Sequence, residues 1–441
     1  MAAILSLAAC VVAICFLLPG VSSGLLNPIF RAAHRRLTKW DKFSQNLTAW
    51  CRSIASDVNY NMLAPAGDLT EQLRIVRASP VAACVTGAMG GVGRELVRRL
   101  TNHSVLQNRT MLSAWTRPEK LLALKDKFPH VRAVGVNLAV GNGTSTAINN
   151  LLAHVLDGAQ ATASGCASLD LLVHNAGLMA KNASLRDTFA VNFYSPMFLS
   201  IAMLPHMLAG SKTPLMLFVG SSSHLRGAPL PSPLPPVEAS RLMGYQGAPH
   251  RIAVAGAYAD AKLRLLLAAT ALERRFGPAG LTVRTAHPGL VDTPMLRGYF
   301  GEALARGWRN LKLLRSEEEG AAAVLLPALT HFDVIRWAPL QTATTPAAAA
   351  VTRDYRRSYH VNGRSAPGKC SSLVNDAAAC EACLQDVVHE IRVTATAATR
   401  GRLIALLKDA APLIDSNADL PDEIKSRRKA ALAALGRDLE E

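Results

Sequence analysis

Residues 81–100 read VAACVTGAMGGVGRELVRRL, and this stretch decides the fold class. It joins a short apolar run to a helix-like sequence through the closely spaced glycines Gly87, Gly90, Gly91 and Gly93. Glycines at such a junction permit a tight turn and a close approach of the backbone to a pyrophosphate. The N–H groups and positive dipole end of the helix then attract the phosphates. The stretch therefore predicts a dinucleotide-binding strand–helix unit, with a plain glycine turn as the alternative.

Further apolar runs alternate with helix-length segments along the middle of the chain. Most are continuously hydrophobic, as strands covered on both faces should be. The alternation predicts an α/β fold with a doubly wound parallel sheet of the Rossmann type, in a single catalytic domain over residues 80–330. Ser316 and Glu319 form a capping box that predicts a helix start. The expected strands are 81–86, 110–115, 131–136, 169–174, 214–220 and 281–286, and a long helix is expected over 255–276.

The segments outside and within this domain have distinct signatures. Residues 1–23 contain an apolar run that would make a helix about 23 Å long, too short for a bilayer core of roughly 30 Å. Small residues follow the run, so we expect either a signal peptide or a membrane anchor, and a location in the secretory pathway or at the endoplasmic reticulum membrane. Residues 24–79 form an N-terminal extension, and residues 331–441 form a mostly helical C-terminal extension. Residues 225–250 are a Pro-rich insertion, either a lid or a surface loop.

Composition and charge narrow the function classes. Half of the 441 residues are hydrophobic and 18% are charged, which suits a large core and excludes a disordered chain. The net charge of +16 lies mostly in the middle block without forming one run, and no nucleic-acid-binding motif accompanies it, so we expect no nucleic-acid partner. Cys380 and Cys383 form a single CxxC pair with Cys370 upstream. Zinc sites usually need two such clusters, so we predict no metal and leave the disulfide state open.

The end of the second expected strand carries the cofactor preference. It reads Ala114-Trp115-Thr116-Arg117, and no carboxylate follows until Glu119. An acidic residue at this point accepts from the ribose 2′-OH of NAD, whereas an arginine accommodates the 2′-phosphate of NADP. Arg117 therefore favours NADP over NAD, and an exposed arginine on a turn is the alternative.

Tyr258 and Lys262 carry the candidate chemistry. Their spacing of four residues places them on one face of a helix, one turn apart. A free tyrosine has a pKa of about 10. A neighbouring ammonium favours the phenolate and brings that value toward neutral pH, so the tyrosine could exchange a proton with a substrate oxygen.

Polar residues at the ends of other strands support this reading. Ser221 ends the fifth expected strand, where doubly wound sheets bind ligands, and Ser222 competes for the same role. Asn175 follows the fourth strand, and Asn192 lies farther along the chain. Taken singly, each of these residues is as compatible with a structural role as with a functional one.

In combination and order, these motifs resemble the short-chain dehydrogenase/reductase family over residues 80–330. Residues 174–179, HNAGLM, and the HPG element at 287–289 are most similar to the branch of retinol dehydrogenases and protochlorophyllide reductases. Two departures stand out. Asn137 replaces the usual acidic residue after the third strand, and the Pro-rich insertion lengthens the spacing between serine and tyrosine. The motifs that carry the resemblance are Thr86-Gly87 with Gly91 and Gly93, Asn175-Ala176-Gly177, Asn192, Ser221, Tyr258 with Lys262, and Pro288-Gly289 with Thr293.

The resemblance implies a role for each matching residue. Tyr258 would be the acid/base, Ser221 would hold the substrate oxygen, and Asn192 would support a proton-relay water. Lys262 would bind the nicotinamide ribose and lower the pKa of the tyrosine. The implied cofactor-binding residues are Gly87, Gly91, Val92, Gly93, Arg117, Asn175, Ala176, Gly177, Tyr258, Lys262, Pro288, Gly289 and Thr293.

The expected function is that of an NADP-dependent oxidoreductase. It would interconvert an alcohol and an aldehyde or ketone, with a lipophilic, retinol-like or other apolar small molecule as substrate and with membrane association. The alternative is a non-catalytic dinucleotide-binding or scaffold protein of the same fold, which the presence of both Tyr258 and Lys262 disfavours. The sequence leaves the oligomeric state open, a homodimer included.

Overall fold

The structure is a computed structural model. Residues 1–23, residues 24–79 and residues 229–249, which make up most of the Pro-rich insertion, lie outside the part of the chain it describes, so the signal, anchor and lid hypotheses stay predictions. The described residues are 82–102, 111–139, 145–164, 168–228, 250–337, 354–361 and 364–441.

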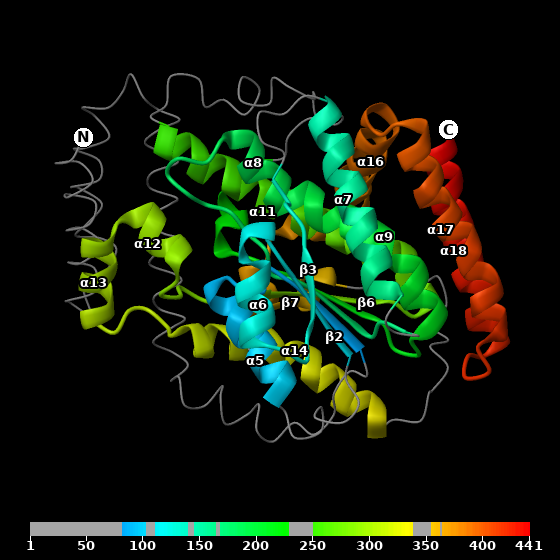
Figure 1. Ribbon diagram of the computed structural model, residues 1–441, viewed down its shortest axis with the longest axis horizontal. Helices are drawn as coiled ribbons and strands as arrows, with labels where there is room; N and C mark the ends of the chain where they lie inside the picture. The colour runs from blue at the N-terminus through cyan, green and yellow to red at the C-terminus, as the bar shows by residue number, and fades with distance from the viewer. Residues whose placement is uncertain are drawn as a thin grey trace.

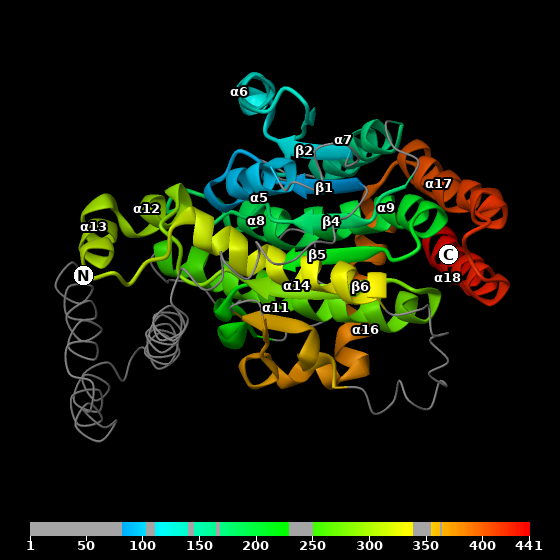
Figure 2. The ribbon, with the colours of Figure 1, turned by 90° about the horizontal axis from the view of Figure 1, so that it is seen from below.

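The centre of the fold is an eight-stranded sheet in the order β3-β2-β1-β4-β5-β6-β7-β8. Strands β1 to β7 pair in parallel, and β8 pairs antiparallel with β7 at one edge. Figure 2 shows the strands from β2 to β6 one after another in this order. The predicted Rossmann-type fold is confirmed, with an antiparallel edge strand that was not predicted. The strands are β1 Ala82–Thr86, β2 Met111–Thr116, β3 Arg132–Gly135, β4 Leu171–His174, β5 Leu215–Val219, β6 Thr282–His287, β7 Tyr359–Val361 and β8 Arg364–Ser365.

Helices cover both faces of the sheet, which is why the strands are apolar throughout. In Figure 1, α5 and α14 lie on one side of the strands, and α7, α9 and α11 lie on the other. Helix α11 begins at His250, earlier than the expected start at residue 255. The capping box at Ser316 and Glu319 forms as predicted, because each residue's N–H donates to the other's side chain. The covering helices are α5 Gly91–Asn102, α6 Leu121–Lys127, α7 Ser145–Ala163, α8 Leu185–Phe189, α9 Ser195–Gly210, α11 His250–Phe276 and α14 Glu317–Trp337.

Two pairs of helices lie at opposite ends of the sheet. Helices α12 and α13 lie at one end, and α17 and α18 at the other (Figures 1 and 2). Short 3₁₀ turns and one π-helical turn connect the larger elements. Their bounds are α12 Pro294–Phe300, α13 Glu302–Asn310, α16 Ala377–Thr394, α17 Ala397–Ser416, α18 Asp422–Glu440, η2 Pro118–Lys120, η3 Ala190–Tyr194, η4 Ser222–Arg226, η5 Gly277–Ala279, η6 Tyr355–Ser358, η7 Pro367–Lys369 and η8 Ser372–Asn375.

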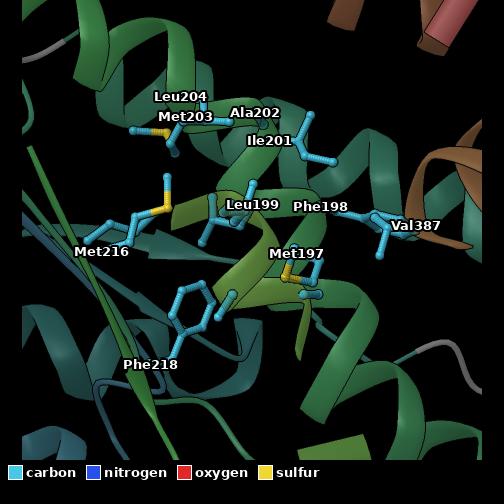
Figure 3. Packing of buried hydrophobic residues seen from close by; sticks show 14 of the residues in the cluster. Met197, Phe198, Leu199, Ile201, Ala202, Met203, Leu204, Met216, Phe218 and Val387 are labelled. Atoms are coloured by element: carbon cyan, nitrogen blue, oxygen red, sulfur yellow. The ribbon is translucent and has the colours of Figure 1, made fainter. Parts of the chain in front are cut away.

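The C-terminal extension shares the main hydrophobic core with the sheet. Figure 3 shows Val387 of α16 in the same buried cluster as Met197 and Phe198 of α9. At the far end, the buried guanidinium of Arg428 on α18 donates to the carbonyl oxygens of Ala279 and Ser211, the latter just beyond the end of α9. Carbonyl groups at a helix C-terminus need such partners because the helix itself supplies none. The extension therefore completes the core.

One apolar helix needs a separate comment. Among the described residues, the stretch Leu185–Gly210 is long and apolar enough to cross a membrane, but 94% of its most apolar window is buried inside the protein. It runs through α8, the π turn and α9, and its side chains form much of the main core. Its hydrophobicity is therefore explained by its position in the middle of the domain.

A buried ion pair joins α11 to the C-terminal extension. Arg264 of α11 donates to the carboxylate of Asp386 on α16, and both side chains are only 2% exposed. Burial, with a further contribution from Asp386, raises the pKa of the nearby Glu390 to about 7. Near neutral pH, Glu390 therefore binds a proton much more readily than an exposed carboxylate does, which reduces the negative charge beside Asp386.

Asp386→Ala is expected to destabilise the fold by about 3–5 kcal/mol, because the charge of Arg264 would stay buried without its main partner. The measurement is urea unfolding followed by circular dichroism. Asp157→Ala serves as the control, because it removes the carboxylate of an exposed ion pair with Arg402, and such pairs contribute little. Equal losses in the two variants would contradict the assignment.

Candidate active site

Parallel strands bring the predicted site residues to one edge of the sheet. Gly87 follows β1, Asn175 follows β4, Ser221 lies just beyond β5, and Pro288 follows β6. The carboxyl ends of these strands lie on the same side, and the strand order reverses between β1 and β4. This reversal is the position where open α/β sheets bind their ligands.

The turn after β1 requires glycine at two positions. Gly87 has φ +67°, and a Cβ there would lie 2.9 Å from Cα of Ala176. A Cβ on Gly93 would lie 2.1 Å from the carbonyl oxygen of Gly87. The turn leads directly into α5, so the backbone N–H groups of Gly91 and Val92 lie at the helix N-terminus. This arrangement fits the pyrophosphate of a dinucleotide.

Asn175 connects the carboxyl ends of β1 and β4 by hydrogen bonds. Its Nδ2 donates to the carbonyl oxygen of Thr86 at 3.0 Å. The hydroxyl of Thr86 accepts from the N–H groups of Asn175 and Ala176 at 3.1 and 3.0 Å. Gly177 then passes close to Asn192, because a Cβ on the glycine would lie 3.2 Å from Oδ1 of Asn192. The Asn175-Ala176-Gly177 motif thus holds the edge beside the glycine turn in place.

The loop after β6 also reaches the N-terminus of α5. Thr293 lies there, with its Cγ2 3.0 Å from where a Cβ on Gly91 would be. Gly289 has φ +85°, and the carbonyl oxygen of Pro288 accepts from Nη1 of Arg315 at 3.1 Å. The structure therefore brings Thr293 to the glycine turn, and Arg315, which the sequence analysis missed, supports the loop that carries it.

Glu317 is a second residue that the sequence analysis missed. Its Oε1 lies 2.5 Å from the position that a Cβ on Gly91 would occupy, so a carboxylate lies beside the phosphate site. Arg94 of α5 pairs with the same carboxylate at 2.5 Å and offsets its charge. The ion pair spans 223 residues of sequence, so no local pattern could have indicated it.

Lys262 connects the tyrosine to the strand that carries the serine. Its Nζ lies 5.7 Å from the ring centroid of Tyr258 and donates to the carbonyl oxygen of Val219 at 2.9 Å. The side chain is buried, and this burial lowers the pKa of Lys262 to about 8. The ammonium form is therefore still favoured at neutral pH, where its charge acts on the neighbouring tyrosine.

His174 lies behind this lysine at the end of β4. Burial, with a smaller contribution from the charge of Lys262, lowers the pKa of His174 to about 3. Its Nε2 lies 2.9 Å from Oγ of Ser200, and its ring stacks on Phe218. A neutral imidazole at this point leaves Lys262 without a competing positive charge.

Asn192 lies in the π-helical turn Ala190–Tyr194, and its side chain is fully buried. Its Nδ2 donates to the carbonyl oxygens of Leu178 and Thr188 at 2.7 and 2.6 Å. One amide hydrogen thus holds the loop after β4 at Leu178, and the other bonds to Thr188 of α8. The proton-relay role stays a prediction, and within this geometry it would fall to the main chain of the π turn.

Ser221 is better placed for substrate than its competitor. Its side chain is half-buried, whereas Ser222 is buried. The Oγ of Ser221 accepts from the N–H of Ser223 at 3.2 Å, so its own proton stays available for donation to another acceptor.

Arg117 lies just beyond β2, with a side chain that is 61% exposed and paired with Glu119 at 3.1 Å. A bound phosphate would compete with this surface carboxylate.

The cysteines form no metal site in the described part of the chain. Cys370, Cys380 and Cys383 are buried thiols outside any disulfide, and burial raises the pKa of Cys380 to about 12. Its Sγ donates to the carbonyl oxygen of Val374 at 3.4 Å. Among the described residues, no group of three or more His, Cys, Asp or Glu side chains could hold a metal ion.

Comparison with known proteins gives one family match. Residues 81–232 match the family described as short chain dehydrogenase, and no curated protein matches the sequence. A dehydrogenase/reductase from Sinorhizobium meliloti is similar at 19% identity and a TM-score of 0.42, covering 61% of this chain and 94% of its own. A carbonyl reductase from chicken fatty liver with bound NADPH has 20% identity and a TM-score of 0.38, with 56% and 88% covered. A 3-alpha-hydroxysteroid dehydrogenase from a Pseudomonas species, complexed with NADH, has 22% identity and a TM-score of 0.38, with 57% and 91% covered.

The family match ends before the tyrosine and the lysine, so the rest of the motif depends on the structure. Lys262, next to Tyr258, donates to the last residue of β5, inside the matched segment, and Thr293 lies against Gly91 of the glycine turn. The structure thus brings Lys262 and Thr293, which lie outside the matched segment, against residues inside it.

Proposed function

We propose that the protein is an NADP-dependent oxidoreductase that interconverts an alcohol and an aldehyde or ketone, with Tyr258 as the acid/base. The observation that carries the proposal is the position of Lys262. Its buried ammonium lies 5.7 Å from the Tyr258 ring and donates to Val219, two residues before Ser221. One cation thus connects the proton-exchanging group with the residue that would hold the substrate oxygen.

The chain's own residues divide the work of the reaction. In the reductive direction, the Tyr258 hydroxyl gives its proton to the substrate oxygen, and in the oxidative direction the phenolate takes the proton back. Ser221 donates its O–H to the same oxygen, because its Oγ already accepts from Ser223. The ammonium of Lys262 favours the phenolate form of Tyr258. The nicotinamide cofactor, when bound, supplies or accepts the hydride.

The glycine turn and Arg117 support the cofactor assignment. The N-terminus of α5 carries backbone N–H groups that could bind a pyrophosphate, and the close contacts at Gly87 and Gly93 require glycine in the turn before it. Arg117 follows β2, the strand end at which dinucleotide folds bind the adenosine ribose, and its exposed guanidinium pairs with the surface carboxylate of Glu119. Replacing that partner by a phosphate costs little, because exposed ion pairs are weak.

The surroundings of the tyrosine support an apolar substrate. Val254 lies four residues before Tyr258 on α11, and it belongs to a small apolar cluster with Tyr299 of α12. Met179 and Phe300 pack against this cluster. Partly exposed apolar side chains such as Met179 and Phe300, close to the tyrosine helix, favour lipophilic molecules over sugars and charged metabolites.

We also propose the retinol dehydrogenase-like branch and a membrane-associated location in the secretory pathway. The first rests on the HNAGLM sequence at 174–179 and the HPG sequence at 287–289, and the second on the apolar run within residues 1–23. Lipophilic substrates partition into membranes, so the proposed location and the proposed substrate class agree with each other.

Tyr258→Phe is expected to lower turnover by about 10²–10⁴-fold, because the ring stays and the transferable proton is lost. Cofactor affinity, measured by NADPH fluorescence, should change little. Tyr355→Phe is the matched control, because this buried ring of the C-terminal extension lies against Arg274 of α11 and precedes β7, at the opposite end of the sheet from the carboxyl ends that carry the site residues. Wild-type turnover in Tyr258→Phe would refute the assigned role.

Arg117→Ala should weaken NADPH binding by about tenfold, the loss of one charge-assisted contact, and leave NADH binding unchanged. Glu119→Ala provides the opposite test, because it frees the guanidinium from its carboxylate and should tighten NADPH binding. Titration calorimetry with both cofactors measures the four affinities. If the preference for NADPH is the same in both variants, Arg117 is only a surface residue.

For the substrate class, we expect kcat/KM to rise by about three- to fourfold per added methylene across a series of unbranched aldehydes, because each buried CH₂ contributes about 0.8 kcal/mol. Phe300→Ala should flatten this rise and leave the shortest substrate unaffected. Steady-state NADPH oxidation gives the values. A flat series in the wild-type protein, with polar and apolar carbonyls used equally well, would contradict a lipophilic substrate.

A further inference from the structure

His224 lies three residues after Ser221, within the turn η4, and the proposed mechanism does not use it. The side chain is only 2% exposed. Both ring nitrogens lie within hydrogen-bond distance of main-chain atoms. Nδ1 lies 2.6 Å from the carbonyl oxygen of Ser221, and Nε2 lies 3.2 Å from the N–H nitrogen of Ser371 in the C-terminal extension.

These two partners fix the protonation of the ring. A carbonyl oxygen can only accept, so the Nδ1–H of His224 donates to Ser221. A main-chain N–H can only donate, so Nε2 accepts from Ser371. The imidazole is therefore neutral and carries its hydrogen on Nδ1. The ring connects two main-chain groups that lie 150 residues apart in the sequence.

The bond from His224 is one of three that hold Ser221. The carbonyl oxygen of Ser221 also accepts the main-chain N–H of His224 at 3.1 Å, and its Oγ accepts the N–H of Ser223 at 3.2 Å. These contacts hold the carbonyl group of Ser221 in place and occupy one lone pair of its hydroxyl oxygen. The direction in which the Ser221 O–H points therefore depends on how firmly His224 and Ser223 hold the residue.

A second contact from the C-terminal extension holds the same loop. The ring of Tyr359 on β7 lies 4.9 Å from the His224 ring, centroid to centroid. Cε2 of Tyr359 also lies 3.2 Å from where a Cβ on Gly220 would be, immediately before the serine. The ring of Tyr359 on β7 and the N–H of Ser371, just before η8, therefore hold the loop from Gly220 to His224.

We propose that His224 is a positioning residue through which the C-terminal extension holds the catalytic serine. The N–H of Ser371 orients the imidazole, and the imidazole orients Ser221. This inference rests on the proposed function, because it gives Ser221 the substrate oxygen to hold. It assigns the extension a part in the active site in addition to its part in the core.

The test removes the N–H of Ser371 without moving the backbone. Ser371 has φ −58°, which proline adopts, and the preceding Cys370 has ψ 147°, which a following proline tolerates. Ser371→Pro therefore deletes the donor to His224. Ser371→Ala is the matched control, because both variants lose the Oγ that accepts from Leu373, while alanine keeps the N–H.

Relative to Ser371→Ala, Ser371→Pro should lower kcat by about tenfold, in keeping with a small misplacement of a catalytic group. NADPH affinity should match that of the alanine variant, whereas the melting temperature should be lower, because Nε2 of His224 is left buried without its donor. Equal kcat in the two variants would overturn the inference.

A double-mutant cycle shows whether the effect passes through the ring. In His224→Asn, the amide Nδ2 replaces Nδ1 as the donor to Ser221 but nothing reaches Ser371. This variant should therefore lose about tenfold in kcat, as Ser371→Pro does, and adding Ser371→Pro should cause no further loss. A further tenfold loss in the double variant would show that the proline acts by another route.

Nitrogen NMR of histidine-labelled protein keeps this inference separable from the proposed function. The wild-type His224 signal, identified by its absence in His224→Asn, should show the Nδ1–H tautomer, and Ser371→Pro should shift its Nε2 resonance. Absence of turnover in the wild-type chain would refute the proposed function and the expected effect of Ser371→Pro on kcat. The tautomer of His224 would still show whether the ring bonds to both Ser221 and Ser371. An Nε2–H tautomer would refute the connection itself.

Discussion

The burial of helix α11 on nearly every side is the constraint on which the rest of the structure depends. One face meets the sheet, where Lys262 donates to Val219. Another meets α16, where Arg264 pairs with Asp386. A third holds the end of the turn η4, because Asp260 accepts from the N–H of Ala228 at 2.8 Å. Polar groups in such a place are stable only with partners, so Lys262, Arg264 and Asp260 each determine the position of another element.

The local parts of the fold could be predicted because their signals are local. The glycines at 87–93 must permit a tight turn whatever surrounds them, and the apolar strand runs follow from coverage on both faces. The spacing of Tyr258 and Lys262 is a property of one helix. The strand limits shifted by one or two residues, because hydrogen-bond pairing with neighbours decides where a strand ends.

The contacts that complete the site could not be predicted, because they join distant parts of the chain. Glu317 beside Gly91, Arg315 on Pro288 and Ser371 on His224 are all pairings that no spacing in the sequence encodes. Asn192 is an intermediate case. The sequence singles it out, but its two amide bonds, one to the loop after β4 and one to α8, depend on a π turn that no sequence pattern indicates.

The strand β7 and the turn at Ser371 have a consequence for how the protein is made. A ribosome releases the glycine turn, the serine loop and the tyrosine helix well before it releases Tyr359 and Ser371. Until then, the neighbouring edge of β6 has no strand beside it, and the core of α11 lacks α16. The nascent chain thus holds all of its reactive residues while the groups that arrange them are still missing. The candidate site is therefore completed late in synthesis, and a chain cut short before residue 359 would carry the motif without the residues that hold its serine loop.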